Sequence, residues 1–434
     1  MVDVIIRNTK NLKGVVCAPP SKPYTQRMVI AAALSNGVSR LSNPLVSEDT
    51  EATLRAVRAL GAEVCVKDDC WAIQGTDTVK GAKKPIDVGD SGATLRFMIP
   101  VAALASAPSA FVLGKGLEKR PVAPLLDSLK HLGAKAEVVK TGRKTSIRVE
   151  GGGLNGGKTT MPGDVSSQFV SGLMFACPLA KVDTFLTLTS PLESKSYVLM
   201  TENVLSKHDV KVDISEDFNR IKIAAKQTYH PVDGKVPGDF SSAAFLLAAA
   251  AVTDSKVCVK NLDYGSIQGD KAIVRILKQM GVNGDVREGQ IEITSSGGPL
   301  SAVDVDARDI PDLVPVCTAL ACHANGTSKI HDAERLRLKE SDRLTSLYTE
   351  LSKMGAEIAM DESGLIINGP CKLHGAIIEP HNDHRIAMAC AVAALRAEGE
   401  TVIQNAECVR KSYPQFFTDL HMLGVDVVGW ELDR

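Results

Sequence analysis

The chain has 434 residues, too many for one ordinary hydrophobic core, so we expect two domains. Hydrophobic residues make up 44% and charged residues 23% of the sequence, and 50 Lys and Arg balance 51 Asp and Glu. This composition is typical of a globular enzyme and excludes a disordered chain or a protein that coats nucleic acid. Because the net charge is only −1, any anion site must come from local clusters of Lys and Arg.

The N-terminal segment MVDVIIRNTKNLKGVV mixes charged and apolar residues, which predicts a strand and not a signal peptide. The longest apolar run, 243–252, is far shorter than the roughly 20 residues that a membrane span needs. We therefore expect no membrane partner. The ten cysteines are scattered and form no CxxC pair, which indicates thiols in a reducing cytoplasm.

One polar loop followed by an Ala-rich helix recurs along the chain. The segment PGDVSSQFVSGLMFACPLA at 162–180 matches PGDFSSAAFLLAAAAV at 237–252, and PPSKPYTQRMVIAAALSNG at 19–37 has the same character. Three further copies surround aspartates at a spacing of about 71 to 75 residues: Asp90, Asp312 and Asp383. The sequence therefore contains six related starts of Ala-rich helices.

A second predicted helix follows each of these helices. Five of the six end at a glycine, and the copy after Tyr197 lacks it: Gly61, Gly133, Gly281, Gly355 and Gly424. Short runs such as AEVCVK, TSIRVE, TFLTLT, IEITSS and GLIING predict strands between the helices. The unit is thus a mixed α/β repeat, present six times, with three copies expected in each domain.

The repeated loops stand at helix N-termini, where free backbone N–H groups and the helix dipole favour anions. Two interpretations stay open for each loop, because Asp, Ser and Thr at such positions also serve simply as helix caps. The basic residues favour anion binding, since ten of them fall in or beside the loops: Lys22, Arg27, Arg96, Arg120, Arg335, Arg337, Lys339, Arg343, Arg385 and Lys411. Asp312 and Glu340 lie among them, as ion-pair partners or as acid and base catalysts.

Nine motifs in order resemble the 5-enolpyruvylshikimate-3-phosphate synthase family across essentially the whole chain. They are SKPYTQR (21–27), GDSGATLR (89–96), LEKRP (117–121), GDVSSQF (163–169), SKSY (194–197), IPD (310–312), RLKESDR (337–343), NDHR (382–385) and RKSYP (410–414). The resemblance implies a two-domain inside-out α/β barrel built from six βαβαββ-type repeats, which closes over its substrates. Residues 18–233 would form the first domain, mainly for shikimate 3-phosphate. Residues 1–17 and 234–434 would form the second, with the catalytic carboxylates and the phosphoenolpyruvate site.

The resemblance also implies the site residues. The shikimate 3-phosphate set is Lys22, Arg27, Ser166, Ser167, Gln168, Ser194, Tyr197, Asp312, Arg335 and Lys339. The phosphoenolpyruvate set is Lys22, Gly92, Arg120, Gln168, Arg343, Arg385 and Lys411. Two positions depart from the family pattern. Pro23 stands where the family usually has Ser, so Ser21 or Thr25 would have to supply that contact, and Arg335 stands where Asn is common.

The implied reaction transfers the enolpyruvyl group of phosphoenolpyruvate to the 5-hydroxyl of shikimate 3-phosphate and releases phosphate. Asp312 matches the base for the hydroxyl proton, and Glu340, with help from Lys22, matches the acid and base at the methylene carbon. The basic neighbours Lys339 and Arg343 should lower the pKa of Glu340, which disfavours its acid form. We expect no cofactor and no metal, although HNDH at 381–384 has His-x-x-His spacing.

Two rival functions remain. UDP-N-acetylglucosamine enolpyruvyl transferases share the fold and the donor, but they typically have Lys-Asn where this chain has Lys22-Pro23. They also have a catalytic Cys in the loop that here spans 114–119 without cysteine. A non-enzymatic repeat scaffold would not need Asp312 and Glu340 among so many cations. We expect a cytoplasmic monomer that binds the two small substrates and no nucleic acid.

Overall fold

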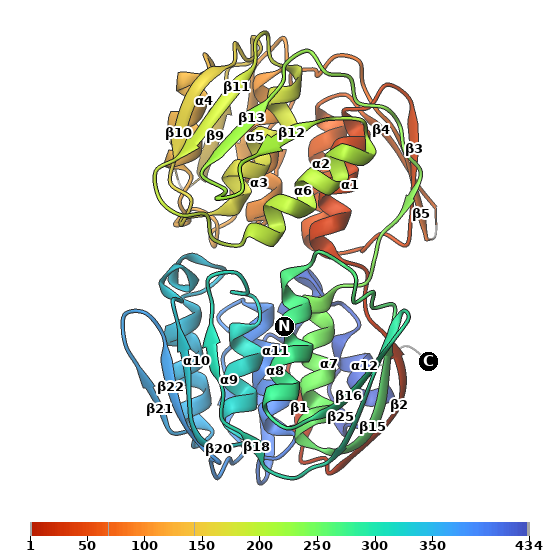
Figure 1. The fold of residues 1–434 in the computed structure, drawn as a ribbon, viewed down its shortest axis with the longest axis vertical. Helices are drawn as coiled ribbons and strands as arrows, with labels where there is room; N and C mark the ends of the chain where they lie inside the picture. The colour runs from red at the N-terminus through yellow and green to blue at the C-terminus, as the bar shows by residue number, and fades with distance from the viewer. Residues whose placement is uncertain (1, 68, 143, 432–434) are drawn as a thin grey trace. The chain divides into compact units, whose positions relative to one another are not determined.

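The structure is a computed structural model that describes residues 2–67, 69–142 and 144–431. The chain forms two compact units (Figure 1). Unit 1 comprises Met1–Pro19 and Pro237–Arg434, and unit 2 comprises Pro20–Val236. The sequence placed the corresponding boundaries at residues 18 and 233. The chain therefore passes from unit 1 to unit 2 and back again.

Unit 2 contains six helices, one 3-10 helix and twelve strands among its described residues. The helices are α1 (Lys22–Ala33), α2 (Glu48–Ala59), α3 (Gly92–Ala103), α4 (Ala123–His131), α5 (Ser167–Ala176), η1 (Cys177–Leu179) and α6 (Lys195–Lys207). The strands are β3 (Val38–Ser42), β4 (Glu63–Lys67), β5 (Cys70–Gln74), β6 (Ile86–Asp87), β7 (Ser109–Val112), β8 (Ala136–Thr141), β9 (Lys144–Val149), β10 (Gly157–Met161), β11 (Thr184–Leu188), β12 (Val212–Ile214), β13 (Arg220–Ile223) and β14 (Gly234–Lys235).

The strands of unit 2 form three four-stranded sheets with one pattern. The orders are β6-β7-β9-β8, β10-β11-β13-β12 and β14-β3-β5-β4. In each sheet the first pair is parallel and the other two pairs are antiparallel. The helices α3, α5 and α6 stand side by side in Figure 1, where α5 contacts both of its neighbours.

Unit 1 contains six α-helices, three 3-10 helices and thirteen strands among its described residues. Its helices are α7 (Phe240–Val252), η2 (Gly269–Lys271), α8 (Ala272–Gln279), α9 (Val314–Ala321), η3 (Glu334–Leu338), α10 (Arg343–Lys353), α11 (His384–Ala394), η4 (Ala406–Lys411) and α12 (Phe416–Met422). Its strands are β1 (Val4–Arg7), β2 (Asn11–Cys17), β15 (Asp254–Lys260), β16 (Asn283–Arg287), β17 (Gln290–Ser296), β18 (Leu300–Ser301), β19 (Asp304–Asp306), β20 (Ala324–His331), β21 (Ile358–Met360), β22 (Leu365–Gly369), β23 (Ile377–Ile378), β24 (Glu400–Ile403) and β25 (Val427–Val428).

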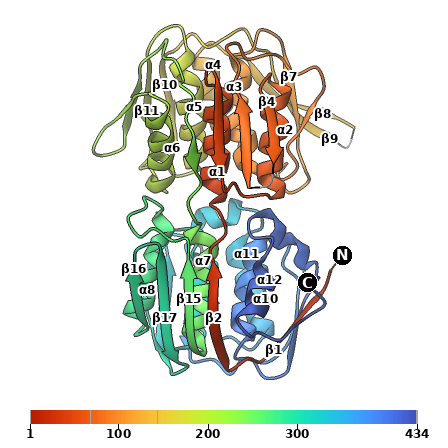
Figure 2. The same cartoon turned by 90° about the vertical axis from the view of Figure 1, so that its right-hand side faces the viewer.

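Two of the three sheets in unit 1 join the beginning of the chain to its later part. Strand β2 pairs in parallel with β15, so Asn11 lies opposite Asp254, and Figure 2 shows the two strands side by side. Strand β1 pairs antiparallel with both β24 and β25. The sheet orders are β16-β17-β15-β2, β23-β24-β1-β25 and β18-β20-β22-β21. The N-terminal segment is therefore two strands, which confirms the prediction of strand there.

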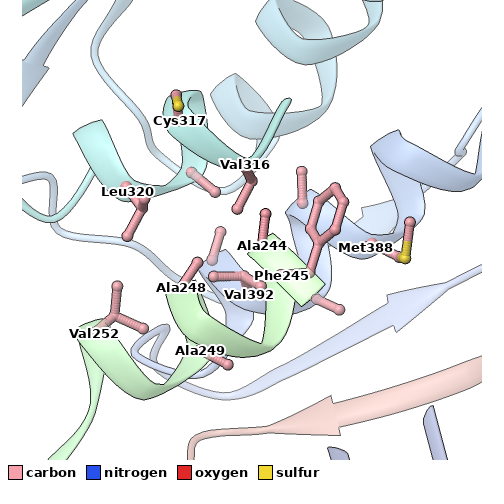
Figure 3. Packing of buried hydrophobic residues seen from close by; sticks show 14 of the residues in the cluster. Ala244, Phe245, Ala248, Ala249, Val252, Val316, Cys317, Leu320, Met388 and Val392 are labelled. Atoms are coloured by element: carbon pink, nitrogen blue, oxygen red, sulfur yellow. The ribbon is translucent and has the colours of Figure 1, made fainter. Parts of the chain in front are cut away.

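The Ala-rich helices form the interior of each unit. Every residue of α7 is buried, and α7 packs against α9 and α11, which also contact each other. Figure 3 shows Ala244 and Ala248 of α7 beside Val316 and Leu320 of α9 and Val392 of α11. Small alanine side chains let three helices approach closely, and the surrounding valines and leucines fill the space between them. Because the three helices pack closely, the loops at their N-termini lie near one another.

The glycine-ended helices occur as predicted. Gly61, Gly133, Gly281, Gly355 and Gly424 all have positive φ after a helix. In the copy that lacks glycine, α6 ends at Lys207, its C-cap is His208 and Asp209 adopts φ 61°. Aspartate tolerates this left-handed conformation better than most residues, so the same helix ending is kept without glycine.

The overall fold is mixed α/β with many small sheets, which confirms the predicted class. Among the described residues, no helix is both long and apolar enough to cross a membrane.

Candidate functional site

The predicted loops of unit 2 do lead into helices. Helix α1 begins at Lys22, α3 at Gly92 and α5 at Ser167. Ser91 and Ser166 act as N-caps, because their side chains accept hydrogen bonds from the backbone N–H groups of Thr94 and Gln168. Capping and substrate binding are therefore not exclusive here, since each hydroxyl keeps further hydrogen-bonding capacity.

Lys22 is at the start of α1 and forms an ion pair. Its Nζ lies 2.8 Å from Oδ2 of Asp49 in the first turn of α2, and both side chains are mostly buried. Asp49 was not singled out from the sequence. An anion that binds Lys22 has to share it with this carboxylate or displace it.

Ser21 and Thr25 were the two candidates to replace the missing contact at Pro23. Thr25 is fully buried, and its hydroxyl donates to the carbonyl of Ser21 and accepts from the backbone N–H of Leu45. The Ser21 hydroxyl is buried and has no hydrogen-bond partner among the described residues. Ser21 is therefore the better candidate of the two.

Arg27 is 2% exposed and serves as a support inside unit 2. Its guanidinium donates to Thr201 Oγ1 at 2.8 Å, to the Pro23 carbonyl at 3.1 Å and to the Tyr197 carbonyl at 3.0 Å. Burial lowers its pKa to about 10, although the rings of Tyr197 and Tyr24 oppose that shift. Arg27 thus positions the backbone of Tyr197, itself a predicted acceptor-binding residue.

Gln168 is held by an arginine that was not placed in either predicted set. Arg96 is 3% exposed, and its Nη1 donates to Gln168 Oε1 at 2.7 Å while Nη2 donates to the Pro121 carbonyl at 3.0 Å. This pair fixes the amide so that its NH₂ group is the side offered to a ligand. The sequence signal was present, because Arg96 ends the motif GDSGATLR.

Gly92 and Arg120 are close neighbours. A Cβ atom built on Gly92 would lie 2.8 Å from Arg120 Nη1, which is closer than real contacts allow. Glycine at the first position of α3 therefore lets the guanidinium lie directly against the helix N-terminus. The two residues belong to the same predicted set, and the structure brings them together.

The remaining predicted residues of unit 2 lie in two joined loops. The backbone N–H of Glu193 donates to the Gly163 carbonyl at 3.2 Å, which connects the loop of Ser194 to the loop of Ser166 and Ser167. Ser194 has φ 55° and ψ 47° and is 2% exposed. Serine seldom adopts this left-handed conformation, and such strain is common at functional sites.

In unit 1, Asp312 does not cap a helix. Helix α9 begins at Val314, and Leu313 is its N-cap without a side-chain contact. The Asp312 carboxylate instead accepts from Arg343 Nη1 at 2.8 Å and lies 3.2 Å from Arg385 Nη2. The capping interpretation is therefore wrong for Asp312.

The charge state of Asp312 follows from this environment. Burial alone would raise the pKa of its carboxyl, and the negative Glu340 acts in the same direction. The cations around it, Arg385, Lys339 and Arg343, outweigh both effects and hold the pKa well below its usual range. Asp312 is thus a carboxylate that is fully ionised at neutral pH.

Arg343 joins three carboxylates and is only 1% exposed. Besides Asp312, it donates from Nη2 to Glu340 Oε2 at 2.8 Å and from Nε to Asp383 Oδ2 at 2.8 Å. Asp383 also caps α11, since its Oδ1 accepts from the backbone N–H of Arg385 at 3.0 Å. Arg343 was predicted to bind phosphoenolpyruvate, and its N–H groups donate hydrogen bonds to carboxylates.

Lys339 lies within the same cluster, and burial lowers its pKa to about 8, with Asp312 opposing the shift. Arg335 is 8% exposed and donates from Nη2 to the Arg308 carbonyl. Lys411 is 6% exposed, and its Nζ donates to the Asn382 carbonyl at 3.0 Å. Lys411 therefore reaches the loop that precedes α11.

The predicted residues of unit 1 form a single cluster, with Arg343 at its centre and Lys411 at the adjoining loop. Sequence reasoning missed Asp383 as a cluster member and Asp270, whose carboxyl interacts with Asp312 and Arg385. The sequence did give a signal for Asp383, because it is one of the aspartates that recur at the repeat spacing. No motif pointed to Asp270.

Comparisons with known proteins agree over nearly the whole chain. The family model described as EPSP synthase (3-phosphoshikimate 1-carboxyvinyltransferase) matches residues 6–420. A curated 3-phosphoshikimate 1-carboxyvinyltransferase of Methanocaldococcus jannaschii is 41% identical over 98% of this chain and 99% of its own length. That of Methanococcus maripaludis strain C7 is 39% identical with the same coverage. The solved EPSP synthase of Acinetobacter baumannii is 27% identical with a TM-score of 0.80, and the match covers 98% of this chain and 100% of that one.

Proposed function

This chain belongs to the EPSP synthase (3-phosphoshikimate 1-carboxyvinyltransferase) family, and from that premise we propose which of its residues carry the reaction. As a member of that family it is an enzyme of the shikimate pathway, which leads to chorismate and the aromatic amino acids. It transfers the enolpyruvyl group of phosphoenolpyruvate to the 5-hydroxyl of shikimate 3-phosphate and releases phosphate. The observation that carries the residue assignment is the ionised Asp312 between Arg343 and Arg385.

We assign the acceptor, shikimate 3-phosphate, to ten residues. They are Lys22, Arg27, Ser166, Ser167, Gln168, Ser194, Tyr197, Asp312, Arg335 and Lys339. Within this set the charged Lys22 and Lys339 attract the phosphate, and hydroxyl and amide groups bind the ring. Arg27 acts through Tyr197, because its three hydrogen bonds are made inside the protein. Ser21 joins the set, because its hydroxyl can replace that of the serine that the family usually has at the position of Pro23.

We assign the donor, phosphoenolpyruvate, to Lys22, Gly92, Arg120, Gln168, Arg343, Arg385 and Lys411. Phosphoenolpyruvate carries a phosphate and a carboxylate, which match the planar donor pairs of arginine. Arg385 binds the donor directly and Arg343 acts mainly by holding Asp312 and Glu340. The reason is that Arg343 already donates to three carboxylates and is the more buried of the two.

Asp312 is the proposed base for the 5-hydroxyl proton. Its low pKa makes it a weak base, so the reaction requires that substrate binding raise this pKa. When the anionic substrates engage Arg385 and Lys339, less positive charge remains for Asp312, and its pKa rises toward the value that proton transfer needs. Substrate binding itself therefore activates the base.

Glu340 and Lys22 are the proposed acid and base at the methylene carbon. The hydrogen bond from Arg343 to Glu340 keeps the carboxylate in place but favours its ionised form. Glu340 must therefore gain a proton before it can protonate C3. C3 protonation and attack by the 5-oxygen on C2, with the hydroxyl proton passing to Asp312, give a tetrahedral intermediate. Loss of a proton from the new methyl group to Glu340 and expulsion of phosphate then restore the C2=C3 double bond.

We further infer that the fold consists of six βαβαββ repeats, three in each unit, as an inside-out barrel. The three similar sheets in each unit and the buried Ala-rich helices support this inference. Three of the sheets are completed by strands from distant parts of the chain, β1 and β2 in unit 1 and β14 in unit 2.

We propose a cytoplasmic monomer that binds two small anions and no nucleic acid. Ten cysteines without a disulfide are consistent with a reducing compartment, and the near-zero net charge with small-molecule substrates.

The decisive experiment measures phosphate release from phosphoenolpyruvate with shikimate 3-phosphate, with UDP-N-acetylglucosamine and with neither acceptor. We expect release only with shikimate 3-phosphate. Release with the sugar nucleotide would favour the related transferase, and binding without release would favour a non-enzymatic role.

A further inference from the structure

Asp270 is a buried carboxyl that the reaction described above does not use. It lies in η2, just before α8, and is 3% exposed. Its Oδ2 accepts a hydrogen bond from Ser241 in the first turn of α7. Its Oδ1 is buried and has no hydrogen-bond partner among the described residues. A buried ionised carboxylate with an unsatisfied oxygen is costly, whereas the neutral acid is tolerated far better.

The groups that interact electrostatically with Asp270, or bond to it, come from all three central helices of unit 1. Asp239 and Ser241 belong to the start of α7, Asp312 and Cys317 to the start of α9, and Arg385 to α11. Figure 3 shows how closely these three helices pack around Ala244, Val316 and Val392. Asp270 therefore lies at the N-terminal end of α7 and interacts electrostatically with Asp312 and Arg385 of the catalytic cluster.

The surrounding charges set the proton affinity of Asp270. Burial raises its pKa to about 7, and the negative charge of Asp312 acts in the same direction, while Arg385 opposes it. Asp312 and Asp270 thus have opposite tendencies in one cluster, one ionised and the other protonated. Two interacting carboxyls of this kind titrate as a pair, in two separate steps.

We propose that Asp270 is a positioning residue that holds a proton as the neutral partner of ionised Asp312, and thereby keeps Arg385 available to the anionic donor. The proposal rests on the proposed function. If Asp270 loses its proton to solvent, a second carboxylate competes for the charge of Arg385 and repels phosphoenolpyruvate. Binding of the donor should in turn stabilise the proton on Asp270.

Two variants separate this role from a purely structural one. Asp270→Asn keeps the size and a hydrogen-bonding group but stays neutral at every pH. Ser241→Ala keeps the carboxyl but removes the hydrogen bond that favours its ionised form, so the titration should move to higher pH. The matched control is Asp419→Asn. Asp419 is also a largely buried carboxyl with a pKa raised, mainly by burial, to about 6, but its partner is Tyr413.

The first measurement needs no substrate. Carbon-13 NMR of aspartate side chains should show a carboxyl that titrates near pH 7 in the parent and in Asp419→Asn. This signal should be absent in Asp270→Asn and shifted upward in Ser241→Ala. Thermal unfolding gives a second readout. The folded protein binds this proton more tightly than the unfolded chain, so the stability contributed by Asp270 should decline from about pH 4 to about pH 7.

The second measurement is the KM for phosphoenolpyruvate between pH 6 and pH 9. In the parent it should rise by up to about tenfold per pH unit above pH 7, and in Asp270→Asn it should change less than about twofold over the same step. A carboxyl that titrates below pH 5, or an unchanged pH profile in Asp270→Asn, would overturn the proposal. If the parent shows no transfer at all, the proposed function fails, while direct binding of phosphoenolpyruvate across the same pH range still decides the role of Asp270.

Discussion

Asp312 is the residue on which the proposed chemistry depends most. Its carboxylate adds negative charge to a cluster that must bind two anions, which costs binding energy unless the group also acts in the reaction. Asp312→Asn removes the base and one repelling charge but keeps the shape. We expect shikimate 3-phosphate to bind as well or better and turnover to fall by roughly 10²- to 10⁴-fold. Calorimetry and phosphate release on one preparation test this, and near-normal turnover would remove Asp312 from the mechanism.

Lys339 gives the acceptor site its own pH dependence. Burial lowers its pKa to about 8, so the unliganded protein loses this positive charge as pH rises through that value. The acceptor phosphate is dianionic in this range and favours the charged lysine. The Kd for shikimate 3-phosphate should therefore rise by up to about tenfold per pH unit above pH 8.

Lys339→Arg provides the control, because arginine stays charged at every accessible pH. Its affinity for shikimate 3-phosphate is expected to be weaker but flat between pH 7 and pH 9.5. If the parent also shows a flat profile by calorimetry, Lys339 does not contact the phosphate.

Among elements, the start of α3 offers the clearest test of the donor site. A methyl group on Gly92 would meet the guanidinium of Arg120 at 2.8 Å, so this far end of a flexible side chain would have to shift. The backbone of Gly92 is helical, so alanine is tolerated there. We expect Gly92→Ala to raise the KM for phosphoenolpyruvate by roughly tenfold, about 1.4 kcal/mol, with little effect on the acceptor.

Gly298→Ala is the matched substitution, since a Cβ at Gly298 has its nearest neighbour at an ordinary 3.5 Å. Its kinetics should equal those of the parent. An equal loss of affinity for both substrates in Gly92→Ala would mean that the helix start had been distorted as a whole.

Helices and their loops could be predicted from the sequence because their signals are local. Alanine runs, serine and aspartate starts and glycine ends recur at fixed spacing, and the structure has a helix at each of the six starts. The ending at Asp209 could not be foreseen, since several residues can adopt a left-handed conformation when packing requires it.

The site was predicted less completely, because its electrostatics depend on contacts between distant residues. Lys22 with Asp49, Arg96 with Gln168 and Arg343 with Asp383 all join residues of different segments. A sequence motif identifies one residue of such a pair but gives no information on which residue it contacts. Asp270 shows the limit most clearly, since burial and neighbouring charge alone distinguish it from other aspartates.

At the scale of the molecule, the two units should differ in their ability to fold alone. Unit 2 is one continuous segment, whereas unit 1 needs β1 and β2 from the beginning of the chain. We expect the fragment 20–236 to unfold cooperatively by circular dichroism. The fragment 237–434 should not, because β15 and β24 lack their partners.

Restoring those strands supplies the control. The backbone N–H of Asp239 donates to the Pro19 carbonyl at 2.8 Å, so a short flexible linker from residue 19 to residue 237 can close unit 1. The joined fragment should recover cooperative unfolding. Failure of 20–236 to fold would show that unit 2 depends on unit 1.

The pairing of β1 with β24 also determines the order in which the molecule can be completed during translation. Residues 4–7 leave the ribosome early, yet their partners at 400–403 are made almost last. At roughly 5 to 20 residues per second, the interval between the end of unit 2 and the synthesis of β24 is on the order of ten to thirty seconds. Throughout that time unit 2 can already be folded, while β1, the first strand to be synthesised, has no β24 to pair with.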